Sequence, residues 1–461
     1  MSLVEPVYLL FLVMAALAFR LAASRPTLAA TVLIVSSLTF YATWNPLCCL
    51  PLLVTATVDF SVGRALGKEE FPGRRRLLLA ISLVSDLSLL VFFKYFNLFA
   101  AGRSFRLVFA AGISFYTFQS ISYVVDVYRR DREPVDSFLS YAAFVSFFPT
   151  LLAGPITRAD TFFPQLSGAR RELTAEEGGA ALFLIALGFV KKCLIADTLA
   201  VNLTNRVFDV PGLYSSVEVL TGVYAYAIQI WGDFSGYTDI AVGSALLLGF
   251  RLKENFNRPY RATDLTEFWR RWHISLSTWL RDYLFFSLPG KRPGTPWPYL
   301  NLLVTFGLGG LWHGASWTFG IWGLMHGAGL GVHRFVQSLR PRRGMPRSRP
   351  LWQKVLGTAV TFHFVAATWV FFRCPTVAQA LDVYRVLGGG SVGAGNVTPA
   401  ILAALAAGFA AQFVPEGWLG KLQLAFVRLP APAQAGALLT VAVSVRFVSG
   451  SAVAPFIYFA F

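Results

Sequence analysis

Charged side chains are scarce in this sequence. They make up 14% of the 461 residues, whereas hydrophobic residues make up 55% and aromatic residues 15%. With a mean hydropathy of +0.57, the chain has too little polar surface to dissolve as a globule of this size. The composition therefore excludes a soluble enzyme or binding domain and predicts an integral membrane protein.

Cysteine is also rare. The four cysteines all lie in or beside apolar segments: Cys48, Cys49, Cys193 and Cys374. An adjacent pair with two distant single residues matches neither the spacing of metal ligands nor a disulfide framework. We interpret the cysteines as packing residues and expect no metal.

Acidic residues are fewer than basic ones, with 24 Asp and Glu against 40 Lys and Arg, which gives a formal charge of +16. The basic residues are scattered through short loops between apolar runs, so we expect contact with anionic lipid and no binding of nucleic acid. Two loops are the most basic, 64–76 and 340–354. The positive-inside rule predicts that both are cytoplasmic.

Long apolar runs dominate the chain, and the strand alternation of membrane barrels is absent. Because a span needs about 20 apolar residues, we expect an all-α polytopic bundle with roughly eleven to thirteen spans, plus re-entrant or interfacial helices. The first run, 6–19, lacks the features of a cleaved signal peptide and is expected to be a retained span. No polar stretch exceeds the size of a loop, so residues 1–461 are treated as one domain.

His313 stands within an uncharged stretch from Pro293 to His333. An ionisable group at membrane depth is expensive, which indicates a functional site. The alternative is a neutral histidine hydrogen-bonded between packed helices. The stretch is long enough for a two-span hairpin with His313 at the far turn, or for tilted or broken helices with His313 in mid-membrane. Its many glycines favour close helix packing.

Two carboxylates, Asp233 and Asp239, interrupt an apolar region together with Gly232 and Gly236. This combination is costly against lipid, so we expect it to line protein or water. The alternative is an aqueous loop between two spans, in which Asp233 caps the following helix.

Downstream, Pro259 predicts a turn, because it pushes Arg258 out of helical geometry. An amphipathic interfacial helix is expected from about Asp264 to Leu288, with His273 on its inner side. The arginines near this helix either touch lipid phosphates or attract an anionic acyl donor such as a phosphate-bearing thioester. The candidates for donor binding are Arg258, Arg270, Arg271 and Arg281.

These motifs resemble the membrane-bound O-acyltransferase family, in particular its bacterial alginate O-acetyltransferase branch. The resemblance is carried by DFSGYTD at 233–239, ENFNRPY at 254–260, FWRRWHISLSTWLRDYL at 268–284 and GGLWHGASWTFGIWGLMHG at 309–327. It extends through GISFYTFQSISYVVDVYR at 112–129, FFPTLLAGPITR at 147–158, GFVKKCLIAD at 188–197, WVFFR at 369–373 and PFIYFAF at 455–461. It is weakest in the first 100 residues and from about 374 to 446.

The resemblance implies a helical bundle around a transmembrane tunnel, with a catalytic core at about 112–373. His313 is then the catalytic residue and His273 the second functional histidine. A neutral imidazole can take a proton from an attacking hydroxyl at physiological pH. Tunnel or oxyanion support is assigned to Trp312, Ser316, Trp317, Asp233 and Asp239. The other histidines, His326, His333 and His363, are interpreted as packing or loop residues.

The sequence therefore predicts an inner-membrane O-acyltransferase with no permanently bound cofactor. It would move acetyl from a cytoplasmic thioester such as acetyl-coenzyme A toward hydroxyls of an extracytoplasmic polysaccharide such as alginate. The resemblance also implies periplasmic acetyltransferase partner proteins. Modification of peptidoglycan, teichoic acid or a secondary metabolite is an alternative within the same chemistry. A transporter or flippase that uses the carboxylates and histidines as a path, and an inactive scaffold, are alternatives of other classes.

Overall fold

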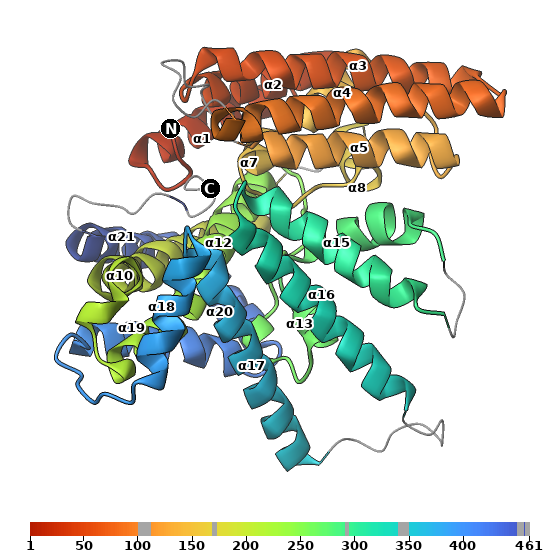
Figure 1. Cartoon of the computed structure of the whole chain (residues 1–461). Coiled ribbons are helices and arrows are strands. Elements are labelled where there is room, and N and C mark those ends of the chain that lie inside the picture. The colour runs from red at the N-terminus through yellow and green to blue at the C-terminus, as the bar shows by residue number, and fades with distance from the viewer. Residues whose placement is uncertain (100–111, 168–172, 291–294, 340–349, 450–455, 457–461) are drawn as a thin grey trace. The chain divides into compact units, whose positions relative to one another are not determined.

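A computed structural model gives the fold, and it describes residues 1–99, 112–167, 173–290, 295–339, 350–449 and 456 (Figure 1). Within these ranges the regular structure is entirely helical, as α, 3-10 and π segments. This confirms the all-α prediction. Most of the basic loop at 340–354 and most of the terminal PFIYFAF motif lie outside the described residues.

Within the described part of the chain, five helical segments are long and apolar enough to cross a membrane: Pro46–Lys68, Pro72–Phe96, Ala175–Asp209, Leu351–Arg373 and Ala431–Val448. A sixth results if α19 (Pro399–Phe413) and α20 (Trp418–Val427), bent by 103°, form one broken span. This is fewer than the roughly eleven to thirteen spans expected. The apolar runs near the N-terminus form α1 (Pro6–Leu21) and α2 (Pro26–Ala42), which fall short of the about 20 residues a span needs.

The chain divides into two compact units. The first comprises Met1–Ile185 with Tyr237–Lys253. After α1 and α2 its elements are η1 (Pro46–Cys48), α3 (Cys49–Lys68), α4 (Pro72–Phe99), α5 (Ile113–Arg129), α6 (Phe138–Ser146), α7 (Phe148–Leu151) and α8 (Ala159–Ser167). Within this unit α3, α4 and α5 lie side by side (Figure 1).

Buried polar side chains join these three helices. Asp59 of α3 accepts a hydrogen bond of 2.6 Å from Ser82 of α4 and another from Ser120 of α5. Thr55 donates to Asp86 of α4 at 3.2 Å. Because buried polar groups need partners, this network fixes how α3, α4 and α5 pack.

The second unit comprises Ala186–Gly236 with Glu254–Phe461. The helices α9 (Ala175–Phe189) and α12 (Ser216–Leu247) contribute residues to both units. Between them lie η2 (Val190–Ala196), α10 (Asp197–Leu199), η3 (Ala200–Thr204), α11 (Asn205–Asp209) and η4 (Pro211–Leu213). Both η2 and η3 are π-helical, a form that often marks functional sites. That the two units act as one domain stays a prediction.

The rest of the second unit follows Glu254. Its elements are η5 (Pro259–Arg261), α13 (Leu265–Arg271), α14 (Ile274–Trp279), η6 (Leu280–Leu284), η7 (Phe285–Ser287), α15 (Trp297–His313), α16 (Trp317–Ser338), α17 (Leu351–Arg373), α18 (Val377–Gly388), α19, α20 and α21 (Ala431–Ser449). Figure 1 shows α15 and α16 running alongside each other, with α17 next to α16. Aromatic side chains fill much of the core of this unit.

Candidate functional site

His313 is the last residue of α15, directly before the turn into α16. Ser316 caps α16, because its hydroxyl accepts a hydrogen bond of 3.3 Å from the backbone N–H of Thr318. The uncharged stretch is thus a helical hairpin with His313 at its turn. Neither helix is among the described segments that are long and apolar enough to cross a membrane, so whether His313 lies at a far turn or in mid-membrane stays a prediction.

Glycine lets the two helices of the hairpin approach closely. A Cβ on Gly310 would lie 2.2 Å from the carbonyl oxygen of Phe319, and one on Gly323 would lie 2.1 Å from that of Phe306. Neither position leaves room for a methyl group, so the packing role predicted for these glycines is confirmed. The contact fixes where His313 stands relative to α16.

Aromatic rings enclose the His313 imidazole, which is 5% exposed. The ring centroids of Trp312, Trp322 and Phe372 lie 4.7, 5.2 and 5.0 Å from that of His313. Phe319 stacks at 6.3 Å. Packing on several sides holds the imidazole in one orientation. A general base needs such a fixed orientation, because it must receive the proton along a defined direction.

A cavity of about 440 Å³ adjoins this histidine. Its wall includes Gly314, which follows His313, and two rings that pack on the imidazole, Phe319 and Phe372. The remaining lining residues are Ala315, Ser316 and Thr318 at the same turn, Arg373, Cys374 and Pro375 after Phe372, Lys192, Asp197, Ala200 and Asn205 between α9 and α12, and Tyr226, Gln229 and Asp233 of α12. The cavity has the size usual for small-molecule sites and combines apolar rings with a few polar groups.

A buried ion cluster forms the polar wall of the cavity. The ammonium Nζ of Lys192 lies 2.7 Å from Oδ1 of Asp197 and 2.6 Å from Oδ1 of Asp233. All three side chains are at most 4% exposed. Charges survive burial of this kind when they are paired, so the cluster fixes the wall in place.

Asp233 lies inside the continuous helix α12. The interpretation of this segment as an aqueous loop with Asp233 as a cap was therefore wrong, because Lys192 supplies the partner that keeps the carboxylate within a buried helix. Asp239 belongs to the first unit and is not among the residues that line the cavity.

The residues around the His313 turn differ in what they face. Ser316 lines the cavity, and its hydroxyl also donates to the carbonyl oxygen of Pro375 at 3.2 Å. Trp312 packs on the imidazole itself. Trp317 is 81% exposed and does not line the cavity. As the first residue of α16 it points outward, so the structure does not bring it to the predicted site.

His273 lies at a break between two short helices. Its φ of 41° is left-handed, and it separates α13 from α14. The single amphipathic helix predicted from Asp264 to Leu288 is therefore wrong, because the backbone turns at His273. Asn255 stabilises the break: its side-chain oxygen accepts hydrogen bonds from the backbone N–H and hydroxyl of Ser275 at 3.0 and 2.9 Å.

Asn255 also holds the His273 ring. Its Oδ1 lies 3.3 Å from Nδ1 of His273, which is 1% exposed. Phe234 packs edge-on at 4.7 Å and Phe256 stacks at 6.2 Å. Burial lowers the pKa of His273 from 6.5 to about 3, so the ring is neutral at physiological pH.

A column of packed rings connects the two histidines. From His273 it passes through Phe256 to Trp272, whose rings are 5.0 Å apart. From Trp272 it continues to Trp369 at 5.0 Å, and from Trp369 to Trp322 at 5.5 Å, which in turn contacts His313. A change at His273 therefore has a packed path to His313.

A second cavity, of about 880 Å³, lies beside the predicted turn at Pro259. Arg258 has a φ of 47°, which confirms that Pro259 takes it out of right-handed helical geometry. Three of the four arginines predicted to bind a donor line this cavity: Arg258, Arg270 and Arg271. The fourth, Arg281, does not line it and pairs with Asp282 at 2.7 Å.

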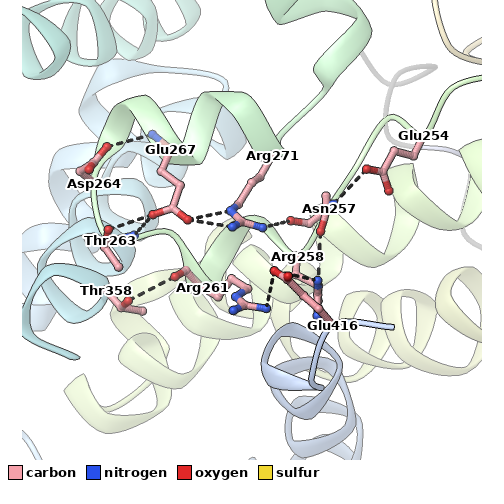
Figure 2. Close-up of polar contacts among 10 residues, drawn as sticks. All are labelled: Glu254, Asn257, Arg258, Arg261, Thr263, Asp264, Glu267, Arg271, Thr358 and Glu416. Carbon is pink, nitrogen blue, oxygen red and sulfur yellow. Dashed lines mark hydrogen bonds and ion pairs between the residues drawn. The ribbon is translucent and has the colours of Figure 1, made fainter. Parts of the chain in front are cut away.

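Carboxylates hold most of these guanidinium groups in place (Figure 2). Arg271 donates to Glu267 at 2.8 Å, and Glu416 lies 3.6 Å from both Arg258 and Arg261. Burial opposes ionisation of Glu267, but hydrogen bonds from Thr263 and Arg271 outweigh it and lower the pKa of Glu267. The carboxylate therefore stays charged and keeps Arg271 oriented toward the cavity.

The other three histidines have hydrogen-bond partners, two of them on neighbouring elements and one within its own helix. His326 accepts from Nε1 of Trp269 at 3.2 Å and lies 2.9 Å from the hydroxyl of Thr368. His363 lies 2.8 Å from the hydroxyl of Tyr224. His333 lies 2.7 Å from Nε2 of the Gln337 side chain. None of the three lines either cavity, which agrees with their interpretation as packing residues.

Sequence reasoning assigned no role to Lys192, Arg373, Tyr226 or Gln229, which all line the cavity next to His313, although Lys192 and Arg373 fall within the quoted motifs at 188–197 and 369–373. For Lys192 a physical signal was also present. Lys191 and Lys192 stand side by side inside a long apolar run, where a charge is costly unless it is paired. Its partner Asp233 lies far along the chain, so only the fold reveals the pair.

The membrane-bound O-acyltransferase family matches residues 129–375. The probable alginate O-acetylase AlgI of Pseudomonas putida is 39% identical in an alignment of 374 residues that covers 77% of this chain and 74% of that protein. The peptidoglycan O-acetyltransferase of Helicobacter pylori is 36% identical over 79% of this chain and 74% of that protein. The teichoic acid D-alanyltransferase of Bacillus subtilis is 30% identical over 58% and 69%.

The family match covers more than half of the chain and includes both histidine motifs. It agrees with the resemblance seen in the sequence and with a helical fold that contains several candidate membrane spans. The chain is a multi-pass membrane acyltransferase of the membrane-bound O-acyltransferase family.

Proposed function

We propose that this enzyme transfers acetyl from a thioester donor, such as acetyl-coenzyme A, to a hydroxyl of an extracytoplasmic polysaccharide such as alginate, with His313 as the general base. The observation that carries the proposal is the position of His313: an oriented imidazole at a hairpin turn, beside a cavity with one polar and one apolar wall.

The proton transfers follow from this position. The acceptor O–H donates to His313, and its oxygen attacks the thioester carbonyl carbon, forming the new C–O bond. The backbone amides of the Gly314–Ser316 turn are the proposed donors to the oxyanion. When the C–S bond breaks, the imidazolium returns the proton to the departing sulfur. General-base catalysis of this kind typically contributes about 10²–10⁴-fold.

His273 is proposed as the second functional histidine. It is buried and neutral. Neither histidine is itself among the lining residues, but His313 directly precedes Gly314 of the 440 Å³ cavity, whereas no chain neighbour of His273 lines that cavity. Its place at the end of the ring column favours a positioning role, in which it sets the packing of Trp272 and, through Trp369 and Trp322, of His313. Asn255 supports this role by holding the ring.

The arginine cavity is proposed to bind the phosphates of the donor. Guanidinium groups pair with phosphate oxygens through parallel hydrogen bonds. Arg270 is exposed and forms no ion pair with any residue that the structure describes, so it is available for a phosphate. Glu416 is 71% exposed and 3.6 Å from Arg258, a weak pair that a phosphate can replace.

The acceptor is proposed from the relatives. Those named alginate O-acetylase share 37–40% identity with this chain, which favours a secreted polysaccharide, reached with the help of periplasmic partner proteins. Other relatives are named peptidoglycan O-acetyltransferase and teichoic acid D-alanyltransferase, so hydroxyls of other cell-envelope polymers are alternative acceptors.

The proposal is tested by base-labile acetate on secreted and cell-wall polysaccharides, from cells that carry the wild type, His313→Ala or His363→Ala at equal protein levels. We expect His313→Ala to lose the ester and His363→Ala to keep it, because His363 packs against Tyr224 outside both cavities. The polymer that loses acetate identifies the acceptor. Equal ester in all three strains would overturn the proposal and favour a transporter or scaffold.

A further inference from the structure

Two aspartates lie buried among α3, α4 and α5 of the first unit. Asp59 belongs to α3 and Asp86 to α4, and both helices are among the segments long and apolar enough to cross a membrane. Both side chains are 0% exposed. Carboxyl groups are costly at such positions, so the buried pair is a candidate functional site.

The two carboxyl groups contact each other, and no basic side chain is paired with them. A hydrogen bond joins Asp59 to Asp86. Within the described residues, neither aspartate forms an ion pair with a lysine or an arginine. Two carboxyl groups this close cannot both stay ionised in a buried site without a compensating positive charge. The pair therefore needs a cation that the neighbouring side chains do not supply.

The contact between the two carboxyl groups itself requires a proton. An ionised carboxyl group only accepts hydrogen bonds, so a bond between two of them exists only when one carries a proton. Among the residues that the structure describes, no other donor reaches Oδ2 of Asp86. One shared proton leaves a single negative charge on the pair.

Hydroxyl groups from all three helices stabilise this charge. Ser82 of α4 and Ser120 of α5 donate to Asp59, the first at 2.6 Å. Thr55 of α3 donates to Asp86 at 3.2 Å. Each hydroxyl oxygen keeps a lone pair, and together with the carboxyl groups they form a set of oxygen ligands, which hard cations prefer. Na⁺ could therefore take the place of the proton.

Tyr116 of α5 adds a buried hydroxyl whose polar contacts are incomplete. Its side chain is 1% exposed and lies close enough to Asp86 for their charges to interact. In the described part of the chain its one hydrogen-bonding contact is the hydroxyl of Tyr41 on α2, which has no other partner. Only one of the two hydroxyl protons can lie between the rings. The other is left for an anion or a ligand beside it, which is expected where a site is completed by something bound.

The other titratable groups around the pair are phenols and thiols. They lie on α2, η1, α3, α5 and α6: Tyr41, Cys48, Cys49, Tyr116, Tyr123 and Tyr141. Such groups are uncharged near neutral pH, so they supply no positive charge. The nearest arginines that act on Tyr123 are Arg64 and Arg132, and each is already paired with an exposed aspartate, Asp136 or Asp160.

We infer that Asp59 and Asp86 form a buried binding site for one monovalent cation, a proton or Na⁺, which holds α3, α4 and α5 together. Loss of the cation leaves two like charges in contact and pushes α3 and α4 apart. The inference does not depend on acyl transfer, because the residues that carry it all belong to the first unit.

Infrared spectroscopy tests for the proton directly, because a protonated carboxyl group has a C=O stretch that an ionised one lacks. Full-length protein in detergent, in sodium-free choline buffer at neutral pH, is compared with Asp86→Asn, Asp59→Asn and Asp160→Asn. In Asp86→Asn the amide can donate to Asp59 in place of the shared proton, so we expect this variant to fold and to lose one carboxyl band. Asp59→Asn should lose the same band, whereas Asp160→Asn, which changes a 72% exposed aspartate of the same unit, should keep it.

Replacing choline chloride by sodium chloride distinguishes the two cations. A wild-type band that decreases as sodium rises would show that Na⁺ displaces the proton. A band that sodium leaves unchanged would assign the site to the proton alone. Equal bands in the wild type, Asp86→Asn and Asp59→Asn in choline buffer would overturn the inference.

The pH dependence of unfolding gives a second, independent measurement. Aspartates of the unfolded chain are ionised at neutral pH, so folding takes up the shared proton, and the stability that it provides is lost as the pH rises. In choline buffer above about pH 6, the folding equilibrium constant of the wild type should fall about tenfold per pH unit relative to that of Asp86→Asn. The same pH dependence in both proteins would also overturn the inference.

Discussion

Lys192 offers a sharp test of the cavity wall. Its ammonium group lies 2.7 and 2.6 Å from two carboxylates, and all three side chains are at most 4% exposed. Lys192→Met keeps the length of the side chain and removes the charge, so Asp197 and Asp233 are left as buried anions without this cation. Breaking a buried ion pair on one side costs about 3–5 kcal/mol of unfolding free energy.

Removing the charges of Asp197 and Asp233 as well should restore most of the unfolding free energy that Lys192→Met loses. In the triple variant Lys192→Met, Asp197→Asn, Asp233→Asn, no charge of the cluster remains buried. Replacing a whole buried ion cluster by well-packed hydrophobic side chains of similar volume is often close to neutral for stability, and Asn, which has the volume of Asp, removes the charge without changing the packing. We therefore expect the triple variant to lie within about 1–2 kcal/mol of the wild type.

Equilibrium unfolding in mixed detergent micelles, followed by circular dichroism, measures these differences. Arg385→Met is the matched control: it removes an ion pair with Asp382 whose side chains are 76% and 49% exposed. Such surface pairs contribute about 0–1 kcal/mol. The reasoning fails if Lys192→Met costs no more than this control, or if the triple variant is as unstable as the single one.

Three further predictions follow from the second unit. Gly310→Ala should destabilise the hairpin by about 1–3 kcal/mol in the same unfolding assay, because its Cβ would lie 2.2 Å from a carbonyl oxygen, whereas Gly331→Ala, with its nearest neighbour at 3.6 Å, should not. Arg270→Gln should raise KM for acetyl-coenzyme A about tenfold with kcat nearly unchanged, and Arg281→Gln, outside the cavity, should alter neither. Burial lowers the pKa of His273 from 6.5 to about 3, so the unfolded chain binds this proton at a higher pH than the folded chain. The free energy of unfolding should therefore fall as the pH drops below about 6.5, and it should fall less steeply in His273→Gln.

The sequence predicted those features of the fold that depend on composition or on the backbone properties of single residues. Scarce charge and long apolar runs predicted helices, and Pro259 predicted the turn that places Arg258 at the edge of a cavity. The uncharged stretch around His313 predicted a hairpin as one of two arrangements. Its glycines predicted close packing, and Gly310 and Gly323 show it.

Tertiary partners explain the failures. The break at His273 depends on Asn255, which lies in another segment and caps α14 through Ser275. The helical periodicity of the sequence continues across His273, so periodicity alone predicted one unbroken helix. Asp233 was compatible with a loop until Lys192 appeared as its partner. Arg373 ends an apolar span, and only the fold shows that it faces the same cavity as the His313 turn.

The central claim is that His313 removes the proton from the acceptor hydroxyl. The most direct measurement is the rate at which purified protein in lipid vesicles transfers labelled acetyl from acetyl-coenzyme A to oligomannuronate, with partner proteins added if the polymer requires them. The account predicts that His313→Gln is about 10²–10⁴-fold slower than the wild type, while His363→Gln, which alters a histidine outside both cavities, keeps the wild-type rate. A His313→Gln enzyme that folds normally and transfers acetyl at the wild-type rate would contradict it.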